Sequence, residues 1–199
     1  ILGFSGGAVI AVAFFDILPE ALELAGTAYS PSAILSITAL GFALYLMLYR
    51  FVLHHGHAEE EDNSSRGDVG ASSISFHSFL DGIGIGLAFQ VSAAVGAVVA
   101  TAVLAHNFSD GINTVNMILR HHGERARALR WLFADALAPV AGIISTLFFT
   151  IPGDMLGLLL ALFAGFFLYI GASDLIPESY HGHPVRWTTI MTLIGIGTL

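Results

Sequence analysis

Two six-residue segments carry the side chains that could do chemistry. They are His77–Gly82 (HSFLDG) and His106–Gly111 (HNFSDG), so each holds a histidine and an aspartate four positions apart. Residues at that spacing lie on the same face of a helix. Neutral imidazole and carboxylate are ligands that borderline divalent metals accept. If the two segments face each other, the pattern predicts a metal site made of His77, Asp81, His106 and Asp110.

The composition indicates that these segments lie in a membrane. Of the 199 residues, 55% are hydrophobic and 11% are charged, whereas a soluble domain carries about 25% charged residues. A helix crosses a bilayer with roughly 20 apolar residues, and no alternation of period two indicates strands. We therefore expect an all-α polytopic transmembrane helical bundle that forms one domain over 1–199. Seven spans are expected, at about 1–25, 33–53, 72–90, 93–119, 128–151, 154–178 and 185–199.

The expected spans contain acids that no base can neutralise. A charged group inside a bilayer costs about 2.5–3.5 kcal/mol by insertion scales, and no arginine or lysine lies deep enough in a span to pair with them. The acids must therefore be protonated, hydrated by a cavity or neutralised by a cation. The absence of cysteine excludes thiolate ligands. The acids are Asp16, Asp81, Asp110, Asp135 and Asp174, with Glu20 and Glu178 nearer the span ends.

The basic residues predict the orientation. The chain has no lysine, and with the spans above all seven arginines fall on one side of the membrane. The positive-inside rule places that side, and the His-rich linker 54–71, in the cytoplasm. The linker is either a solvated loop or a loose cytoplasmic metal site. So few basic residues, so scattered, exclude a nucleic-acid partner.

A second repeat lies outside the two histidine segments. The sequence DILPE at 16–20 resembles DLIPE at 174–178, and the expected topology runs these two spans in opposite directions. Such a pattern indicates an inverted repeat, which is common in secondary transporters. The acids of these segments are either pathway or gate residues, or the two prolines mainly kink their helices.

Other polar residues extend the first pattern, and each has a simpler interpretation. Ser78 and Asn107 follow the two histidines, and the glycines at 82, 84 and 86 would allow two helices to approach closely. A single histidine–aspartate pair is often only a hydrogen bond between helices. Asp135 either serves the site or caps or bridges a helix.

These motifs resemble those of the ZIP (Zrt/Irt-like) family of divalent-metal transporters. The resemblance covers nearly the whole chain and rests on the two histidine motifs, the two Pro-Glu segments and the His-rich linker. It implies eight helices with both ends outside and an inverted repeat around a central helix pair. The chain would then correspond to the second through eighth helices, as a fragment that lacks the first helix and the end of the last.

The resemblance also implies roles for individual residues. The family site is described as two adjacent metal positions, which implies His77, Asp81, His106 and Asp110 as core ligands, with Ser78 and Asn107 beside them. Asp174 matches a position on the release path, and Glu178 would help to guide exit. The chain departs from the family pattern in having Asp as both motif acids, Leu80 and Ser109 where proline is frequent, and Ala138 before Pro139. Asp135, one turn earlier, would substitute for the acid expected there.

The predicted function is transport of a divalent metal into the cytoplasm, with zinc as the first candidate and iron, manganese or cadmium as alternatives. The metal is then substrate, so we expect no enzyme, no catalytic residues and no bound cofactor. The predicted location is a bacterial cytoplasmic (inner) membrane, the predicted partners are metal ions and lipid, and a homodimer is one candidate assembly. Two rival hypotheses are an intramembrane zinc-dependent hydrolase, in which the same ligands activate a water, and a metal sensor that uses the linker.

Overall fold

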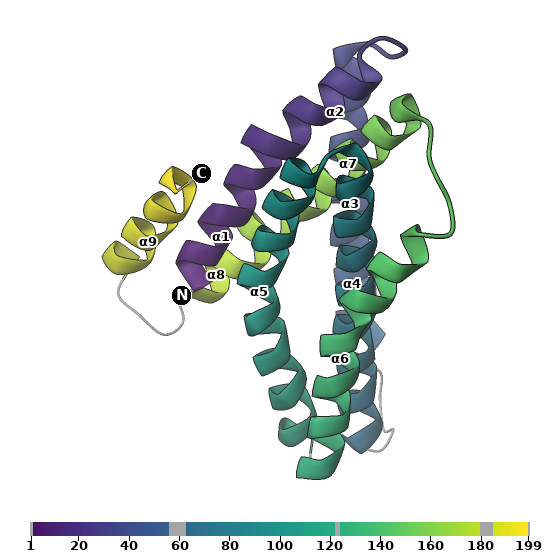
Figure 1. Ribbon diagram of the computed structural model, residues 1–199. Helices are drawn as coiled ribbons and strands as arrows, with labels where there is room; N and C mark the ends of the chain where they lie inside the picture. The colour runs from purple at the N-terminus through teal and green to yellow at the C-terminus, as the bar shows by residue number, and fades with distance from the viewer. Residues whose placement is uncertain (1, 56–62, 122–123, 180–184, 199) are drawn as a thin grey trace. The chain divides into compact units, whose positions relative to one another are not determined.

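The computed structural model describes residues 2–55, 63–121, 124–179 and 185–198, and every regular element in these ranges is helical (Figure 1). The all-α prediction is therefore confirmed. The elements are α1 (Leu2–Ala11), η1 (Val12–Ile17), α2 (Leu18–Ala25), α3 (Pro31–His55), α4 (Asn63–Val91), α5 (Ala93–Arg120), α6 (Arg125–Thr146), α7 (Gly153–Tyr169), η2 (Ile170–Leu175), α8 (Ile176–Ser179) and α9 (Val185–Gly197).

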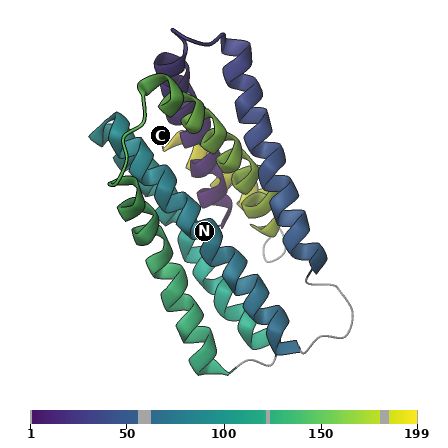
Figure 2. The ribbon, with the colours of Figure 1, turned by 90° about the vertical axis from the view of Figure 1, so that its right-hand side faces the viewer.

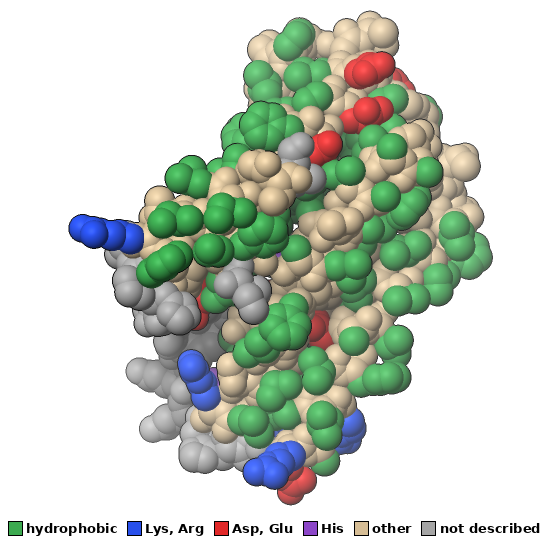
Figure 3. All heavy atoms as spheres, turned by 60° about the vertical axis from the view of Figure 1, so that its left-hand side comes forward, with side chains coloured by type: hydrophobic (Ala, Val, Ile, Leu, Met, Phe, Trp, Pro, Cys, Tyr) green, Lys and Arg blue, Asp and Glu red, His purple; other side chains and the backbone are tan. Residues whose placement is uncertain are grey.

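Six helical stretches among these residues are long and apolar enough to cross a membrane, which confirms a multi-pass protein. They are Leu2–Ala25, Pro31–Leu48, Gly67–Val91, Ala93–Arg120, Arg125–Thr146 and Gly153–Ser179. Where a seventh span was expected, at 185–199, the structure has the 13-residue helix α9. Large apolar side chains such as Leu104, Phe108 and Phe133 are more than 60% exposed, and hydrophobic side chains are spread over the face in Figure 3. In a bilayer such side chains would contact lipid.

The two Pro-Glu segments adopt the same local structure. The π-helices η1 and η2 each have six residues, with Asp16 and Asp174 in the fifth position. Pro19 and Pro177 follow as the second residues of α2 and α8. A proline has no N–H to donate and its ring crowds the carbonyl four residues earlier, and a wider π-turn accommodates both effects. Each helix is thus widened before its proline rather than broken. An inverted repeat that extends over the rest of the chain stays a prediction.

The chain forms two compact units. The first unit comprises residues 1–46, 87–106 and 150–199, and the second comprises 47–86 and 107–149. In the first unit, glycines allow close helix packing, because a Cβ on Gly7 would collide with the backbone of α9 and a Cβ on Gly41 with that of α7. Gly157 lies against Ala25 of α2, and Gly6 lies against Gly171 and Leu175 of η2. The two Pro-Glu segments therefore lie on neighbouring antiparallel helices.

In the second unit, α4, α5 and α6 run side by side (Figure 2). Helix α4 begins at Asn63, so residues 63–71, expected to be part of the polar linker, are helical. The reason is packing at the start of α4. Ala71 is buried with Ile118 and Ala128, and Trp131 donates a hydrogen bond to Asp68 at 2.8 Å. Residues 56–62, which hold most of the linker's acids, lie outside the described residues.

Candidate metal centre

Helix α4 presents the first histidine–aspartate pair as its spacing predicts. The Nε2 atom of His77 lies 3.2 Å from Oδ2 of Asp81, and the two side chains are 12% and 3% exposed. The pair is formed by local helix geometry, since residues four apart share a face. It therefore needs no long-range contact to form.

Helix α5 brings the second pair to the first. Inside the second unit, Nε2 of His77 is 3.9 Å from Oδ2 of Asp110. His106 lies one turn before Asp110 on the same unbroken helix, so the position of Asp110 also fixes that of His106. The His106 side chain is fully buried.

The tautomer of His106 follows from its neighbour. Its Nδ1 atom lies 3.1 Å from the carbonyl oxygen of Ala102, and a carbonyl oxygen can only accept a hydrogen bond. Nδ1 therefore donates this hydrogen bond, and in the neutral ring Nε2 carries the lone pair. Fixing one ring nitrogen in this way is how proteins commonly orient a metal-binding imidazole.

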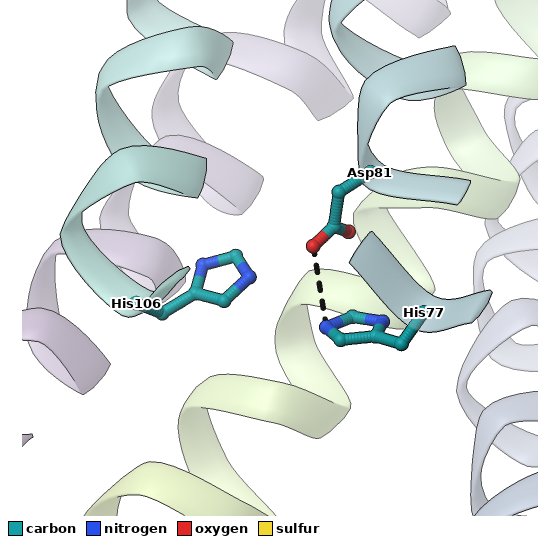
Figure 4. A group of neighbouring side chains, drawn as sticks. All are labelled: His77, Asp81 and His106. Atoms are coloured by element: carbon teal, nitrogen blue, oxygen red, sulfur yellow. Dashed lines mark ion pairs between the residues drawn. The ribbon is translucent and has the colours of Figure 1, made fainter. Parts of the chain in front are cut away.

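One atom each from His77, Asp81 and His106 lies within 4.8 Å of the other two. Figure 4 shows the three side chains directed toward one another, two from α4 and one from α5. Zinc bound at about 2.1 Å to nitrogen and oxygen ligands separates neighbouring ligand atoms by roughly 3.4 Å in a tetrahedron. A small contraction would thus bring this cluster, with Asp110 beside it, to the size of a zinc site.

Helix α6 adds a third carboxylate next to the cluster. The hydroxyl of Ser78 donates a 2.8 Å hydrogen bond to Oδ1 of Asp135, and the two residues are 1% and 5% exposed. Because Ser78 adjoins His77, this bond holds Asp135 at the side of the α4 motif. In the sequence Asp135 is an isolated acid within an expected span. Its hydrogen-bond partner Ser78 lies 57 positions away in the chain and could be identified only from the fold.

Glycines set the distance between α4 and α6. A Cβ on Gly82 would collide with the backbone of Pro139, and one on Gly142 with the backbone of α4 at Phe79 and Ile83. A Cβ on Gly86 would meet Thr146, also on α6. Glycines of the α4 motif were expected to allow two helices to approach closely, and Gly82 and Gly86 do so, with α6 as the neighbour. Close packing of α4 on α5 occurs nearer the helix ends, where Gly70 contacts the sulfur of Met117.

The remaining predicted residues are less closely tied to the cluster. Asn107 is half-buried, and its Oδ1 atom is buried without a hydrogen-bond partner. Such an oxygen is available to bind a metal ion. Glu178 is exposed on α8, and Asp174 lies in η2. Both belong to the first unit, and their role on a metal pathway stays a prediction.

About two thirds of the sequence matches the model of a known protein family. The family model of the ZIP zinc transporters matches residues 69–198, a range that includes both histidine motifs and α6. The chain belongs to the ZIP zinc transporter family.

Several curated ZIP proteins are similar to this chain. Zinc transporter ZIP10 of Danio rerio is 28% identical over 124 residues, which cover 58% of this chain and 15% of that protein. Zinc transporter ZIP4 of Mus musculus is 28% identical over 123 residues, or 62% of this chain and 19% of the relative. Zinc transporter ZIP6 of Homo sapiens is 23% identical over 136 residues, or 64% and 18%. The chain thus spans less than a fifth of the length of these ZIP relatives.

Proposed function

We propose that this protein carries a divalent metal ion, zinc in the first place, across a membrane into the cytoplasm. The observation that supports the proposal most directly is the His77, Asp81 and His106 cluster, which lies within helices apolar enough to span a bilayer. Membership of the ZIP family points the same way. It also disfavours the rival hypothesis of an intramembrane hydrolase.

The ligand types suit reversible binding. Imidazole nitrogen and carboxylate oxygen accept zinc, iron, manganese and cadmium, whereas thiolates favour softer ions and are absent here. In this proposal the ion loses most of its water and binds between α4 and α5 to His77, Asp81, His106 and Asp110. The carboxylates make the site attractive to a cation, and the neutral imidazoles add affinity without adding charge.

The Ser78–Asp135 pair and Asn107 are the residues that we propose for a second, adjacent metal position. Asp135 would supply a carboxylate from α6, held by its 2.8 Å bond to Ser78. Asn107 would supply the amide oxygen that has no partner. We propose Asp174 and Glu178 as later contacts on the way to the cytoplasm.

The test is uptake of radioactive zinc into liposomes that contain the purified protein. The double variant His77→Ala/Asp81→Ala should abolish uptake and remain in the membrane, because it removes two of the three clustered ligands. Asp154→Ala, which removes an acid from the first turn of α7, is the matched control and should transport like the wild type.

Three results would contradict the proposal. Undiminished uptake by the double variant would rule out the cluster as the transport site. Cleavage of a peptide or lipid ester by the wild type, without accumulation of zinc, would favour the hydrolase. A response to zinc that survives loss of the cluster would favour a sensor.

A further inference from the structure

A cavity of about 440 Å³ lies between α4 and α6 in the second unit. It is lined by Asp68 of α4 and by Arg127, Arg130, Trp131 and Ala134 of α6. The four residues of α6 follow one another at helical spacing, at i, i+3, i+4 and i+7, so they share one face of the helix. The fold thus brings two arginines together in one concave place.

The wall of this cavity carries a net positive charge, because it has two guanidinium groups and one carboxylate. Asp68 accepts the hydrogen bond of the Trp131 indole at 2.8 Å, and its Oδ2 atom lies 3.7 Å from Nη1 of Arg127. Because this ion pair is 37% and 40% exposed, it is weak and another anion can compete for the guanidinium. An arginine has five N–H donors in a planar fork, which one carboxylate does not use up.

The cavity lies where the headgroups of a membrane would be. Both arginines belong to the first two turns of the candidate membrane span Arg125–Thr146, at the end that the positive-inside rule assigns to the cytoplasm. Trp131 follows them, and tryptophan is enriched at membrane interfaces. Deeper in the span, Phe133 and Leu137 are 66% and 48% exposed, and they share a helix face with Arg130. A cationic cavity followed by an exposed apolar strip matches the two parts of a phospholipid.

We propose that this cavity binds the phosphate group of an anionic phospholipid, whose acyl chains lie along Phe133 and Leu137. Arginine binds phosphate through paired, charge-assisted hydrogen bonds. Basic pockets between membrane helices on the cytoplasmic side are suited to anionic headgroups. The exposed apolar side chains favour a lipid over a soluble phosphate. The inference depends on the chain lying in a membrane and does not depend on the transport function proposed above.

The test measures which lipids the purified protein retains in detergent, by native mass spectrometry. The probes are dioleoylphosphatidylglycerol, which is anionic, and dioleoylphosphatidylcholine, which has the same acyl chains and no net charge. The wild type should bind phosphatidylglycerol at least about tenfold more tightly. Arg127→Gln/Arg130→Gln should weaken that binding about thirtyfold, because each arginine near an anionic lipid contributes about fivefold. Its zinc binding should be unchanged.

Two further variants separate a built site from a general attraction. Arg120→Gln/Arg125→Gln removes two exposed arginines from the same side of the membrane that do not line the cavity, so it should retain phosphatidylglycerol like the wild type. Asp68→Asn removes the competing negative charge and keeps an oxygen that can accept the indole hydrogen bond. It should bind phosphatidylglycerol severalfold more tightly.

Equal retention of the two lipids by the wild type would overturn the inference. So would an equal loss in the cavity variant and in the Arg120→Gln/Arg125→Gln control, since the attraction would then come from general surface charge. Inorganic phosphate that binds as tightly as phosphatidylglycerol would show that the ligand is a soluble anion instead. Arg130→Gln alone leaves the Asp68–Arg127 pair intact and should weaken binding about fivefold, which keeps the test decisive if the double variant is unstable.

Discussion

The two motif glycines should respond very differently to the same substitution. In Gly82→Ala the new methyl group meets the backbone of Pro139, which cannot rotate away, so α4 and α6 must separate. In Gly111→Ala the nearest atom is Cδ1 of Leu132 at 3.1 Å, the end of a flexible side chain. The two changes are chemically identical and occur at equivalent motif positions, so each serves as the control for the other.

The size of the difference follows from two opposing terms. Overpacking in a tight interior costs about 1–3 kcal/mol, and contact with rigid backbone places Gly82→Ala near the upper value. Alanine is better than glycine in a helix by about 1 kcal/mol, which applies to both variants. Gly82→Ala should therefore lose about 2 kcal/mol of stability, whereas Gly111→Ala should be neutral or slightly stabilised.

The site should change along with stability. Moving α6 away from α4 lengthens the 2.8 Å bond between Ser78 and Asp135, so Gly82→Ala should also bind zinc more weakly. Thermal unfolding in detergent, followed by tryptophan fluorescence, and calorimetric zinc titration measure the two effects. Equal melting temperatures for the two variants, or greater damage from Gly111→Ala, would show that the close approach of α4 and α6 does not control the site.

Two further changes test contacts inside the second unit. Ser78→Ala should cost about 1–2 kcal/mol of stability and weaken zinc binding, because it leaves the buried Asp135 carboxylate without its 2.8 Å donor; thermal unfolding and zinc titration measure this. Asp68→Ala should cost about 1 kcal/mol in thermal unfolding with zinc binding intact, since it removes the acceptor of the Trp131 hydrogen bond and only a partly exposed pair with Arg127.

Controls distinguish these contacts from general effects of substitution. Ser72→Ala removes an exposed hydroxyl that bonds only to the backbone of its own helix, so it should leave zinc binding unchanged. Trp131→Phe should reproduce most of the stability loss of Asp68→Ala. A zinc affinity that falls as much in Ser72→Ala as in Ser78→Ala would contradict the role given to the Ser78–Asp135 bond.

Local sequence patterns predicted the helices and the histidine–aspartate pairs, because both features depend on residues that are close in the chain. Hydropathy identified the apolar helices, and the spacing of four residues predicted the His77–Asp81 pair, which lies at 3.2 Å. The same rule placed His106 and Asp110 on one face of α5. These predictions needed only helix geometry and the absence of a base that could neutralise the acids.

Contacts between helices could not be obtained in this way. Nothing in the spacing of Gly82 and Gly86 says which neighbouring helix they face, and they face α6 rather than α5. The polar composition of 63–71 suggested a linker, but burial of Ala71 and the bond to Asp68 stabilise a helix there. Local propensity is a weak guide when tertiary packing supplies most of the helix stability.

The charge of the second unit indicates how much positive charge the centre requires. Asp81, Asp110 and Asp135 are 3%, 8% and 5% exposed, and no lysine or arginine occurs from 67 to 119 or from 131 to 149. Three ionised carboxylates beside neutral imidazoles carry one more negative charge than a single zinc ion can balance. The hydrogen bond from Ser78 stabilises the Asp135 carboxylate but does not neutralise it. An uncompensated buried charge costs on the order of several kcal/mol, so a centre that holds one zinc ion also needs a proton or a second cation. The carboxylate that α6 contributes, which neither histidine motif contains, is what creates this additional requirement.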